Sequence, residues 1–383
     1  MADKEHVEDF FWLNRWILKC VALWKPDNPN KCIQISYAFY RIFVLLYVNF
    51  YFTGTELLDL YYNVGNLYEF IKNISVALTH MLGLVKVSFI FFNRNALIKI
   101  MKTLSKKNLR YECCPEKDFY PGRISQEYEL LGRKCTCIFL SVATIGILAS
   151  YVPPTLVALQ YDENDPDSYI PDYMPYRAWM PFKIDVSTKS YLLAVLYEAI
   201  PLYSFAYSII ATDCLFINII NNITMHLRTI RGAMTSIRER TVKKINGPDL
   251  TPDGLYNSKE LNEKMKQEMN KIIQHLQEVY RVSEDLETVH TGVTLAQIFS
   301  TLFIICSCLY LVSTAEEVPD SIFQCDWLTA DKDFKNSCLY TMVRAGRPLV
   351  FTAGKFVPLT FGTYVSVMKA AYSTFAVIKN TSK

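Results

Sequence analysis

The chain has 383 residues, of which 51% are hydrophobic and 20% charged, and its formal net charge is +3. Such a small net charge gives no reason to expect a nucleic-acid partner. The apolar residues are gathered into long blocks, so the composition predicts an all-α integral membrane protein in contact with lipid.

Residues 1–31 are expected to form a cytoplasmic N-terminus with an amphipathic helix that lies in the membrane or re-enters it. Arg15 and Lys19 interrupt the apolar stretch 10–24, which makes this stretch a poor signal peptide. Its large aromatic side chains are suited to anchoring a helix at the membrane surface. They are Phe10, Phe11, Trp12, Trp16 and Trp24.

Residues 32–226 are predicted to hold four membrane spans, at about 33–52, 70–92, 135–159 and from Tyr191 past Ile220. The segments after the second and fourth spans are rich in Lys and Arg. The loop expected after the first span, at 54–68, has neither residue, and the loop after the third span is acidic. The positive-inside rule therefore places the N-terminus in the cytoplasm and the first and third loops outside.

Three ionisable residues fall within the predicted spans: Lys86 in the second, and Glu198 and Asp213 in the fourth. At membrane depth such groups face a cavity or pair with a partner. The alternative is that the two carboxylates lie near the membrane surface and are solvated.

Residues 227–290 are interpreted as a cytoplasmic loop followed by an anchor helix. From 258 to 290, apolar residues recur every three or four positions, as on one face of an amphipathic helix. They are Leu261, Met265, Met269, Ile272, Leu276, Val279, Val282 and Leu286. Such a regular stripe needs an apolar partner surface, and we expect it to mediate association between subunits. The alternative is a solvated helix that caps the bundle.

A fifth span is predicted at 291–313, a short connection at 314–325 and a last segment at 326–383. The last segment begins polar and ends in an apolar stretch, 356–378, which is about long enough to cross a bilayer. This stretch holds Lys369 among several Ser and Thr residues, so we expect one face of the helix to contact water.

The sequence shows none of the common catalytic or metal-binding motifs. Its five histidines are far apart and lack HExxH spacing, and there is no GxSxG, P-loop or GxGxxG sequence. We therefore expect no enzymatic activity, no cofactor and no bound metal.

Three stretches of the sequence carry recognisable motifs. The first is RAWMPF at 177–182 and the second is ATDCLF at 211–216. The third is the C-terminal block, with CDW at 325–327, RP at 347–348 and KAAYSTFAV at 369–377. All three are similar to motifs of the insect odorant receptors, which are subunits of odorant-gated cation channels. The chain resembles the variable, odorant-binding subunits more closely than the shared co-receptor, whose second inner loop is much longer.

The resemblance implies a helical bundle with seven spans, of which the sequence shows six. The family's sixth span would fall at 314–325, a stretch too short to cross a bilayer. After it, Trp327, Arg344 and Pro348 would belong to a cytoplasmic helical anchor between subunits.

The resemblance also implies a heterotetramer with odorant co-receptor subunits in the plasma membrane of olfactory sensory neurons. The last helix of each subunit would line a central pore for cations. The matching motif places the narrow apolar gate near Val377, with Ser373, Asn380 and Thr381 beside it. A hydrophobic ring can close a pore by dewetting, and neighbouring polar groups tolerate hydrated cations.

A volatile odorant needs a mostly apolar, aromatic site with one or two polar groups. We expect this site in the outer halves of the second, third and fourth spans. The candidate residues are Thr79, His80, Met81, Gly146, Ile147, Ser150, Tyr151, Tyr197, Pro201 and Phe205.

Other membrane proteins are alternatives to an odorant-gated channel. The chain could be an accessory or dominant-negative isoform without a channel of its own. A G-protein-coupled receptor fits less well, because the N-terminus is predicted inside and no DRY or NPxxY sequence is present. The gustatory branch also fits less well, because no QF follows Thr363 and Tyr364 at the expected distance.

Overall fold

The computed structural model describes residues 10–26, 30–65, 67–105, 111–162, 168–175, 178–246, 259–316 and 332–345. Towards the C-terminus it also describes the pairs 352–353, 357–358, 362–363, 365–366, 369–370, 372–373 and 376–377. By contact the chain divides into two compact units, Met1–Gly54 with Gly83–Leu295, and Thr55–Leu82 with Ala296–Lys383.

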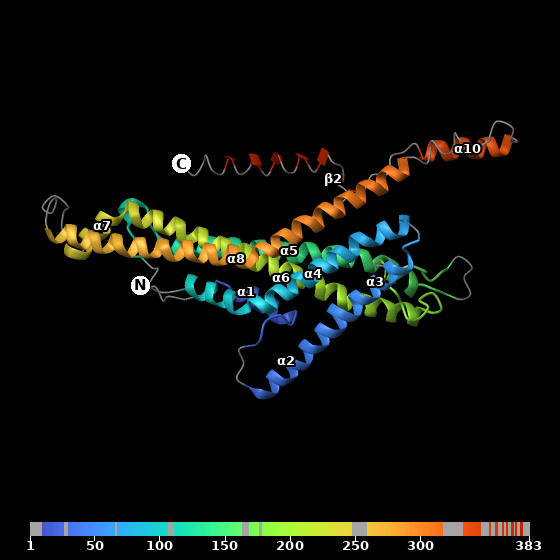
Figure 1. Cartoon of the computed structure of the whole chain (residues 1–383), viewed down its shortest axis with the longest axis horizontal. Helices are drawn as coiled ribbons and strands as arrows, with labels where there is room; N and C mark the ends of the chain where they lie inside the picture. The colour runs from blue at the N-terminus through green and yellow to red at the C-terminus, as the bar shows by residue number, and fades with distance from the viewer. Residues whose placement is uncertain are drawn as a thin grey trace. The chain divides into compact units, whose positions relative to one another are not determined.

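The described residues are almost entirely helical, which confirms the all-α fold class (Figure 1). The helices are α1 (Trp12–Cys20), α2 (Lys31–Phe43), the π-helix η1 (Val44–Phe52), α3 (Thr53–Tyr62), α4 (Leu67–Leu104), the 3-10 turn η3 (Pro115–Lys117), α5 (Pro121–Leu159), α6 (Thr188–Thr235), α7 (Ile237–Asn246), α8 (Lys259–Glu316) and α10 (Lys332–Ala345).

Five helical segments of the described chain are long and apolar enough to cross a membrane. They are Lys31–Tyr62, Ala77–Leu104, Pro121–Leu159, Thr188–Thr235 and Lys259–Cys306. Each contains most or all of one of the first five predicted spans. The sixth predicted span, at 356–378, lies mostly outside the described residues.

The helices extend further than the predicted spans. α3 continues through residues that were expected to form a loop after Gly54, and α4 continues past Arg94 and Lys99 to Leu104. Glu, Lys and Arg are good helix formers, so Glu56 in α3 and the basic residues in α4 end the apolar stretch without ending the helix. The loop boundaries predicted at these two places are therefore wrong.

α8 joins two elements that the sequence analysis separated, the amphipathic helix at 258–290 and the fifth span. The stripe on this helix packs within the chain's own core, since Ile272, Val279, Val282 and Leu286 are buried there with residues of α4 and α6. This contradicts the expectation that the stripe mediates association between subunits. A periodic stripe shows that an apolar partner exists, but not which surface provides it.

The N-terminal helix α1 packs against α6. Phe11 and Trp24 are buried in the core, so the interfacial anchoring expected of these two side chains is wrong. Trp12 and Trp16 are 44% and 57% exposed, as expected of side chains at a membrane surface. α1 is therefore amphipathic, with one face against the bundle and one exposed aromatic face.

The C-terminal segment contains a short antiparallel pair of strands, β1 (Thr352–Ala353) and β2 (Val357–Pro358). The last helix was expected to begin at about Phe356, and this boundary is wrong because Val357 and Pro358 are in a strand. Proline has no backbone N–H and is disfavoured inside a helix, whereas an edge strand accepts it. The described pairs from 362 to 377 are helical.

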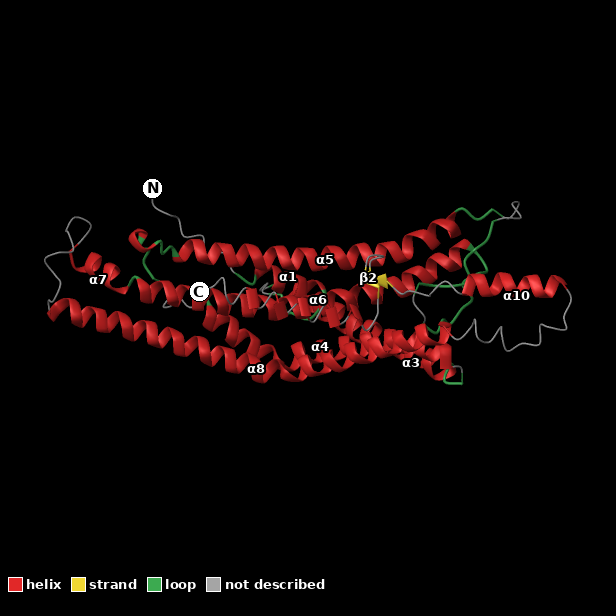
Figure 2. Ribbon diagram, turned by 90° about the horizontal axis from the view of Figure 1, so that it is seen from above, coloured by secondary structure: helices red, strands yellow, loops and turns green. Residues whose placement is uncertain are grey.

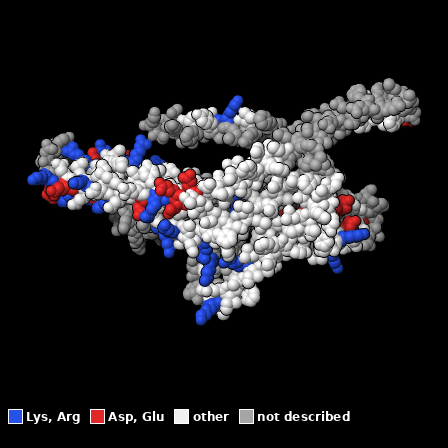
Figure 3. Space-filling model, in the orientation of Figure 1, with Lys and Arg blue, Asp and Glu red and all other residues white. Residues whose placement is uncertain are grey.

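Charged side chains are unevenly distributed over the face shown in Figure 3. Lys, Arg, Asp and Glu gather over α7 and the first half of α8, at the left of the view, while the central part of this face is almost free of them. Many apolar side chains on the spans are exposed, among them Phe39, Phe92, Ile138 and Leu193. An uncharged, apolar surface of this kind is expected where a helical bundle contacts lipid.

α5 and α6 lie against each other (Figures 1 and 2). Where they meet, the side-chain amide of Asn218 donates to Asn14 Oδ1 at 2.9 Å and to Thr136 Oγ1 at 3.1 Å. Gly132 makes this contact possible, because a Cβ at this position would lie 2.2 Å from Asn218 Oδ1. The absence of a side chain at Gly132 therefore sets how closely the two helices pack.

Replacing Gly132 with alanine is expected to destabilise the protein by about 1–3 kcal/mol, the usual cost of overpacking. Gly122→Ala, in the first turn of the same helix, is the matched control, since no atom lies within 4 Å of the added Cβ. Thermal unfolding of the detergent-solubilised protein measures both. Equal midpoints for the two variants would show that the contact at Gly132 is not tight.

Candidate functional site

The C-terminal part of α5 and the N-terminal part of α6 enclose a small apolar cluster. Ile147 and Tyr151 of α5 are buried against Leu202 of α6. Partly buried residues surround them: Met174, Val195, Ala199, Tyr203 and Ala206. The hydroxyl of Thr188 donates to the carbonyl oxygen of Ala158 at 3.0 Å and so ties the start of α6 to the end of α5. Ile147 and Tyr151, both predicted site residues, are thus brought together.

A buried carboxyl group lies beside this cluster. The hydroxyl of Tyr151 donates to Glu198 Oε2 at 2.9 Å, and Glu198 is fully buried. A tyrosine–carboxyl pair within apolar surroundings holds polar oxygen atoms at a defined position. A ligand that reaches the cluster could therefore be oriented by a hydrogen bond as well as by its apolar surface.

Tyr197, the residue before Glu198 in α6, is surrounded by aromatic rings. The rings of Tyr47, Tyr51, Phe52 and Phe182 lie edge-on to it, with centroids 6.2 to 6.4 Å away. The hydroxyl of Tyr47 donates to the backbone oxygen of Tyr197 at 3.2 Å. Edge-to-face rings are a favourable aromatic arrangement. We call these five residues the Tyr197 ring cluster.

The four rings around Tyr197 were missed by the sequence analysis. Three of them come from η1, in the first span, which was not considered as part of the site. A usable signal was present in the spacing of Phe43, Tyr47 and Tyr51, which places aromatic side chains on one helix face. In the structure these rings stack in turn, at 5.3 and 5.9 Å.

The remaining predicted residues of α5 and α6 are placed differently. Gly146 and Ser150 are exposed, and the Ser150 hydroxyl donates to the Gly146 oxygen at 3.0 Å. Pro201 is buried within α6. Phe205 is buried in a core cluster with Val44 and Val48. The structure thus separates Gly146 and Ser150, which are exposed, from Ile147 and Tyr151, which are buried.

Thr79, His80 and Met81 belong to the second compact unit. His80 is buried, and its Nδ1 lies 2.5 Å from Glu56 Oε2 of α3. Thr79 is half-buried, and Met81 is 43% exposed. Within this unit, the imidazole of His80 is therefore held by a carboxyl group.

Two of the predicted pore residues, Ser373 and Val377, are helical and exposed. Asn380 and Thr381 lie outside the described residues. The same holds for Trp327 and Pro348 of the predicted anchor. Arg344 is in α10, but its side chain is not described.

The ionisable residues of the second and fourth spans form a pair. Lys86 Nζ donates to both carboxylate oxygens of Asp213, at 2.7 and 2.8 Å. The Lys86 side chain is 1% exposed, and that of Asp213 is 45% exposed. Of the two alternatives left open by the sequence, the structure supports pairing with a partner over solvation near the membrane surface.

A family model and individual known proteins similar to this chain all point to one family. The family model described as 7tm Odorant receptor matches residues 66–315 and 307–372. Odorant receptor 2a of Drosophila melanogaster is 21% identical, over 92% of this chain and 92% of that protein. Putative odorant receptor 59c of the same species is 31% identical, over 18% of this chain and 17% of that protein.

Two solved structures share the fold. The insect olfactory receptor OR5 from Machilis hrabei superposes with a TM-score of 0.58, at 16% identity, over 97% of this chain and 99% of that chain. The same receptor in complex with eugenol gives a TM-score of 0.57, at 14% identity, over 98% and 100%. The family model covers well over half of the sequence, and five apolar helices could cross a membrane. The chain therefore belongs to the insect odorant receptor family and is a multi-pass membrane receptor, not an enzyme.

Proposed function

We propose that this chain is the odorant-binding subunit of a ligand-gated, non-selective cation channel that it forms with co-receptor subunits. It would act in the plasma membrane of olfactory sensory neurons, with its N-terminus in the cytoplasm. The observation that carries the proposal is the site at the C-terminal part of α5 and the N-terminal part of α6. There Tyr197, at the centre of the ring cluster, directly precedes Glu198, the partner of Tyr151, in the sequence of α6.

This site has the chemistry that a volatile odorant requires. Aromatic rings offer a large apolar contact area with few rotatable bonds. Tyr151 and Glu198 add polar oxygen atoms at a fixed position, which can distinguish odorants by their polar group. Binding opens the channel to the extent that the odorant binds the open state more tightly than the closed state.

The direct test is a current recording from cells that express this chain together with an odorant co-receptor. A panel of volatile compounds should evoke cation currents that are absent when either subunit is expressed alone. If no compound in a broad panel evokes a current although both subunits reach the cell surface, the channel proposal is wrong. A reduction of the currents of another receptor would instead indicate an accessory role.

Replacing Tyr197 with leucine is expected to raise the EC50 of an active odorant about tenfold. The change removes the central ring, and tenfold corresponds to about 1.4 kcal/mol, close to the lower end of the contribution of one buried large apolar side chain. Tyr197→Phe keeps the ring and should respond nearly as the unmodified receptor does. Leu193→Ala, one turn earlier on α6 and 61% exposed, is the matched control and should leave the EC50 unchanged. Equal EC50 values for all three variants would remove Tyr197 from the site.

A further inference from the structure

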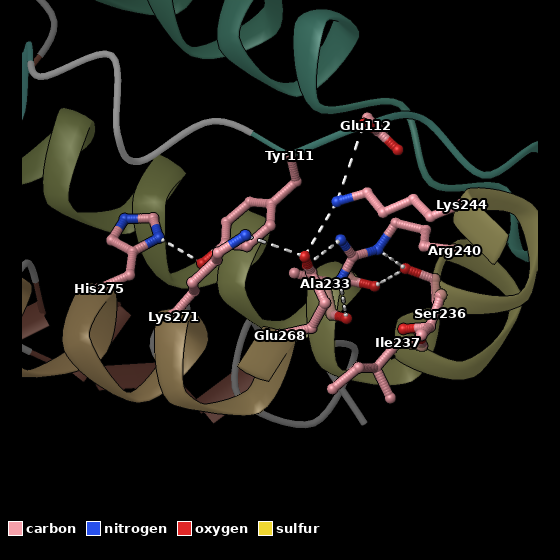
Figure 4. Close-up of polar contacts among 12 residues, drawn as sticks. Tyr111, Glu112, Ala233, Ser236, Ile237, Arg240, Lys244, Glu268, Lys271 and His275 are labelled. Atoms are coloured by element: carbon pink, nitrogen blue, oxygen red, sulfur yellow. Dashed lines mark hydrogen bonds and ion pairs between the residues drawn. The ribbon is translucent and has the colours of Figure 1, made fainter. Parts of the chain in front are cut away.

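A buried polar network lies apart from the candidate site, where α6, α7 and the first half of α8 meet the residues that follow α4 (Figure 4). Residues 259–290 of α8 carry twelve charged side chains, whereas 293–312 carry none. The network therefore lies outside the apolar, membrane-spanning part of α8. None of its residues was predicted to have a functional role.

One half of the network is centred on Arg240 of α7, which is 1% exposed. Its guanidinium donates to Glu268 Oε2 at 3.3 Å, to Ser236 Oγ at 3.1 Å and to the backbone oxygen of Ala233 at 2.7 Å. Lys244 and Lys271 donate to the other oxygen of Glu268, at 2.9 and 3.1 Å. Burial opposes ionisation of Glu268, but these two lysines outweigh it and lower the pKa of the carboxyl group. The ion pair between Arg240 and Glu268 therefore joins α7 to α8.

The other half is a chain of hydrogen bonds that has one direction. The backbone oxygen of Leu104, the last residue of α4, can only accept, so His226 Nε2 must donate to it, at 2.9 Å. In a neutral imidazole His226 Nδ1 then accepts, from His275 Nε2 at 3.0 Å. His275 Nδ1 in turn accepts from the hydroxyl of Tyr111 at 3.0 Å. With both imidazoles neutral, each nitrogen and the hydroxyl thus act either as donor or as acceptor in a fixed order.

The protonation states agree with this assignment. Burial raises the pKa of Tyr111 to about 12 despite the opposing effect of Arg240, so its hydroxyl keeps the proton that it donates. Burial, and then the neighbouring His226, lower the pKa of His275 to about 4, so this imidazole is neutral at physiological pH. A second proton on His226 would bring its Nδ1–H face to face with the N–H of His275 Nε2. A second proton on His275 would sit on Nδ1 and reverse the hydrogen bond with the Tyr111 hydroxyl.

Tyr111 joins the two halves. Its hydroxyl is held by His275, and the guanidinium of Arg240 lies over its ring, 5.2 Å from the centroid. Such a cation–π contact is favourable, most of all where both groups are removed from water. One side chain in the segment between α4 and α5 thus contacts α7 and α8 together, and reaches α4 and α6 through the two histidines.

We propose that Tyr111 is a positioning residue in a latch that sets the equilibrium between the resting and active states of the receptor. The latch consists of Tyr111, His226, His275, Arg240, Glu268 and the backbone oxygen of Leu104. This inference rests on the proposed channel function, because it concerns the response that an odorant evokes. The role of the latch is separate from that of the odorant site.

The physical reason is that this network is directional. Buried polar groups are stable only while each has its partner, whereas apolar contacts tolerate small displacements. A shift of the first half of α8 by the length of a hydrogen bond would separate His275 from both of its neighbours and Glu268 from Arg240. α8 is one continuous helix from Lys259 to Glu316, so a shift at one end is carried along its axis. The latch therefore favours one of the two states.

The test is Tyr111→Phe, which removes the hydroxyl and leaves the ring under Arg240. The loss of one hydrogen bond corresponds to about a fivefold change in the equilibrium between states. EC50 and unstimulated current should both change, with a lower EC50 accompanying a higher unstimulated current or the reverse. Glu268→Gln breaks the other half of the latch and should move both quantities in the same direction as Tyr111→Phe.

The matched control is Lys264→Gln, which breaks an exposed ion pair with Glu260 on the same helix and should change neither quantity. All comparisons are made at equal surface expression. If the unmodified receptor responds to odorant but Tyr111→Phe and Glu268→Gln leave both quantities unchanged, or shift them in opposite directions, the latch is wrong. A silent unmodified receptor would instead overturn the proposed channel function.

A second measurement tests the latch without a current. In the purified receptor, Tyr111→Phe should speed amide hydrogen exchange in residues 259–290 and leave residues 135–159 of α5 unchanged. Unchanged exchange in 259–290 would overturn the latch, and faster exchange throughout the protein would show a general loss of stability in its place.

Discussion

Removing Asp213, the partner of the buried Lys86, is expected to destabilise the receptor by about 3–5 kcal/mol. The two groups make a bidentate contact between α4 and α6, and Lys86 is almost completely buried. Asp213→Leu leaves a buried ammonium group without its counter-charge. Lys86→Met leaves a half-exposed carboxylate, so we expect the smaller loss for this variant.

The double variant Lys86→Met/Asp213→Leu should recover most of the stability. A buried ion pair gains little over well-packed apolar residues, since desolvation of two charges offsets most of their attraction. The thermal unfolding midpoint of the solubilised protein measures all three variants. The cycle separates the cost of an unpaired charge from the cost of altered packing.

The control for this cycle is Lys99→Met/Asp285→Leu, which removes a pair that also joins α4 to another helix. Lys99 Nζ lies 3.6 Å from Asp285 Oδ2, and the two side chains are 67% and 40% exposed. Exposed pairs contribute about 0–1 kcal/mol, so the control should unfold nearly as the unmodified protein does. If the Lys86 and Asp213 single variants lose no more stability than this control, the pair has no structural role.

Replacing Val377 with serine is expected to raise the unstimulated current of the proposed channel at least roughly tenfold. Shielding one valine side chain from water contributes about 1.5–3 kcal/mol, and about 1.4 kcal/mol corresponds to a factor of ten. A polar ring would also no longer exclude water from a narrow pore. Val377 is 62% exposed in the single chain, as a residue that contacts a pore or other subunits would be.

Val377→Ile is the matched variant, because it keeps the side chain apolar and should leave the closed pore intact. Unstimulated and odorant-evoked currents are recorded with the co-receptor at equal surface expression. Unchanged currents in the serine variant would show that the gate lies elsewhere on the last helix.

Local patterns in the sequence were sufficient for five of the six predicted membrane spans and for the fold class. The lengths of the apolar stretches and the distribution of Lys and Arg are properties of single segments, and five of the spans agree with helices of the described chain. The same patterns were less informative about helix ends. α4 and α8 both continue through charged residues, because a helix can extend beyond the bilayer.

Patterns within one segment could not show which segments meet. His226 and His275 are 49 positions apart and lack any metal-ligand spacing, yet their rings share a hydrogen bond. The stripe on α8 indicated an apolar partner, and the structure shows that this partner is the chain's own core. Tyr151 was expected to offer a hydrogen bond, but its acceptor, Glu198, became evident only once α5 and α6 were packed together.

The sequence by itself therefore determined that this protein is an all-helical membrane protein with ionisable groups within its predicted spans. Helix formation and lipid exposure depend on residues close together in the chain, and these can be read directly. Only the tertiary structure decided that Lys86 pairs with Asp213, 127 positions away, and that Tyr111 joins α7 to α8. Those contacts depend on how each helix is rotated and shifted against its neighbours, which the periodicity of a single helix does not encode.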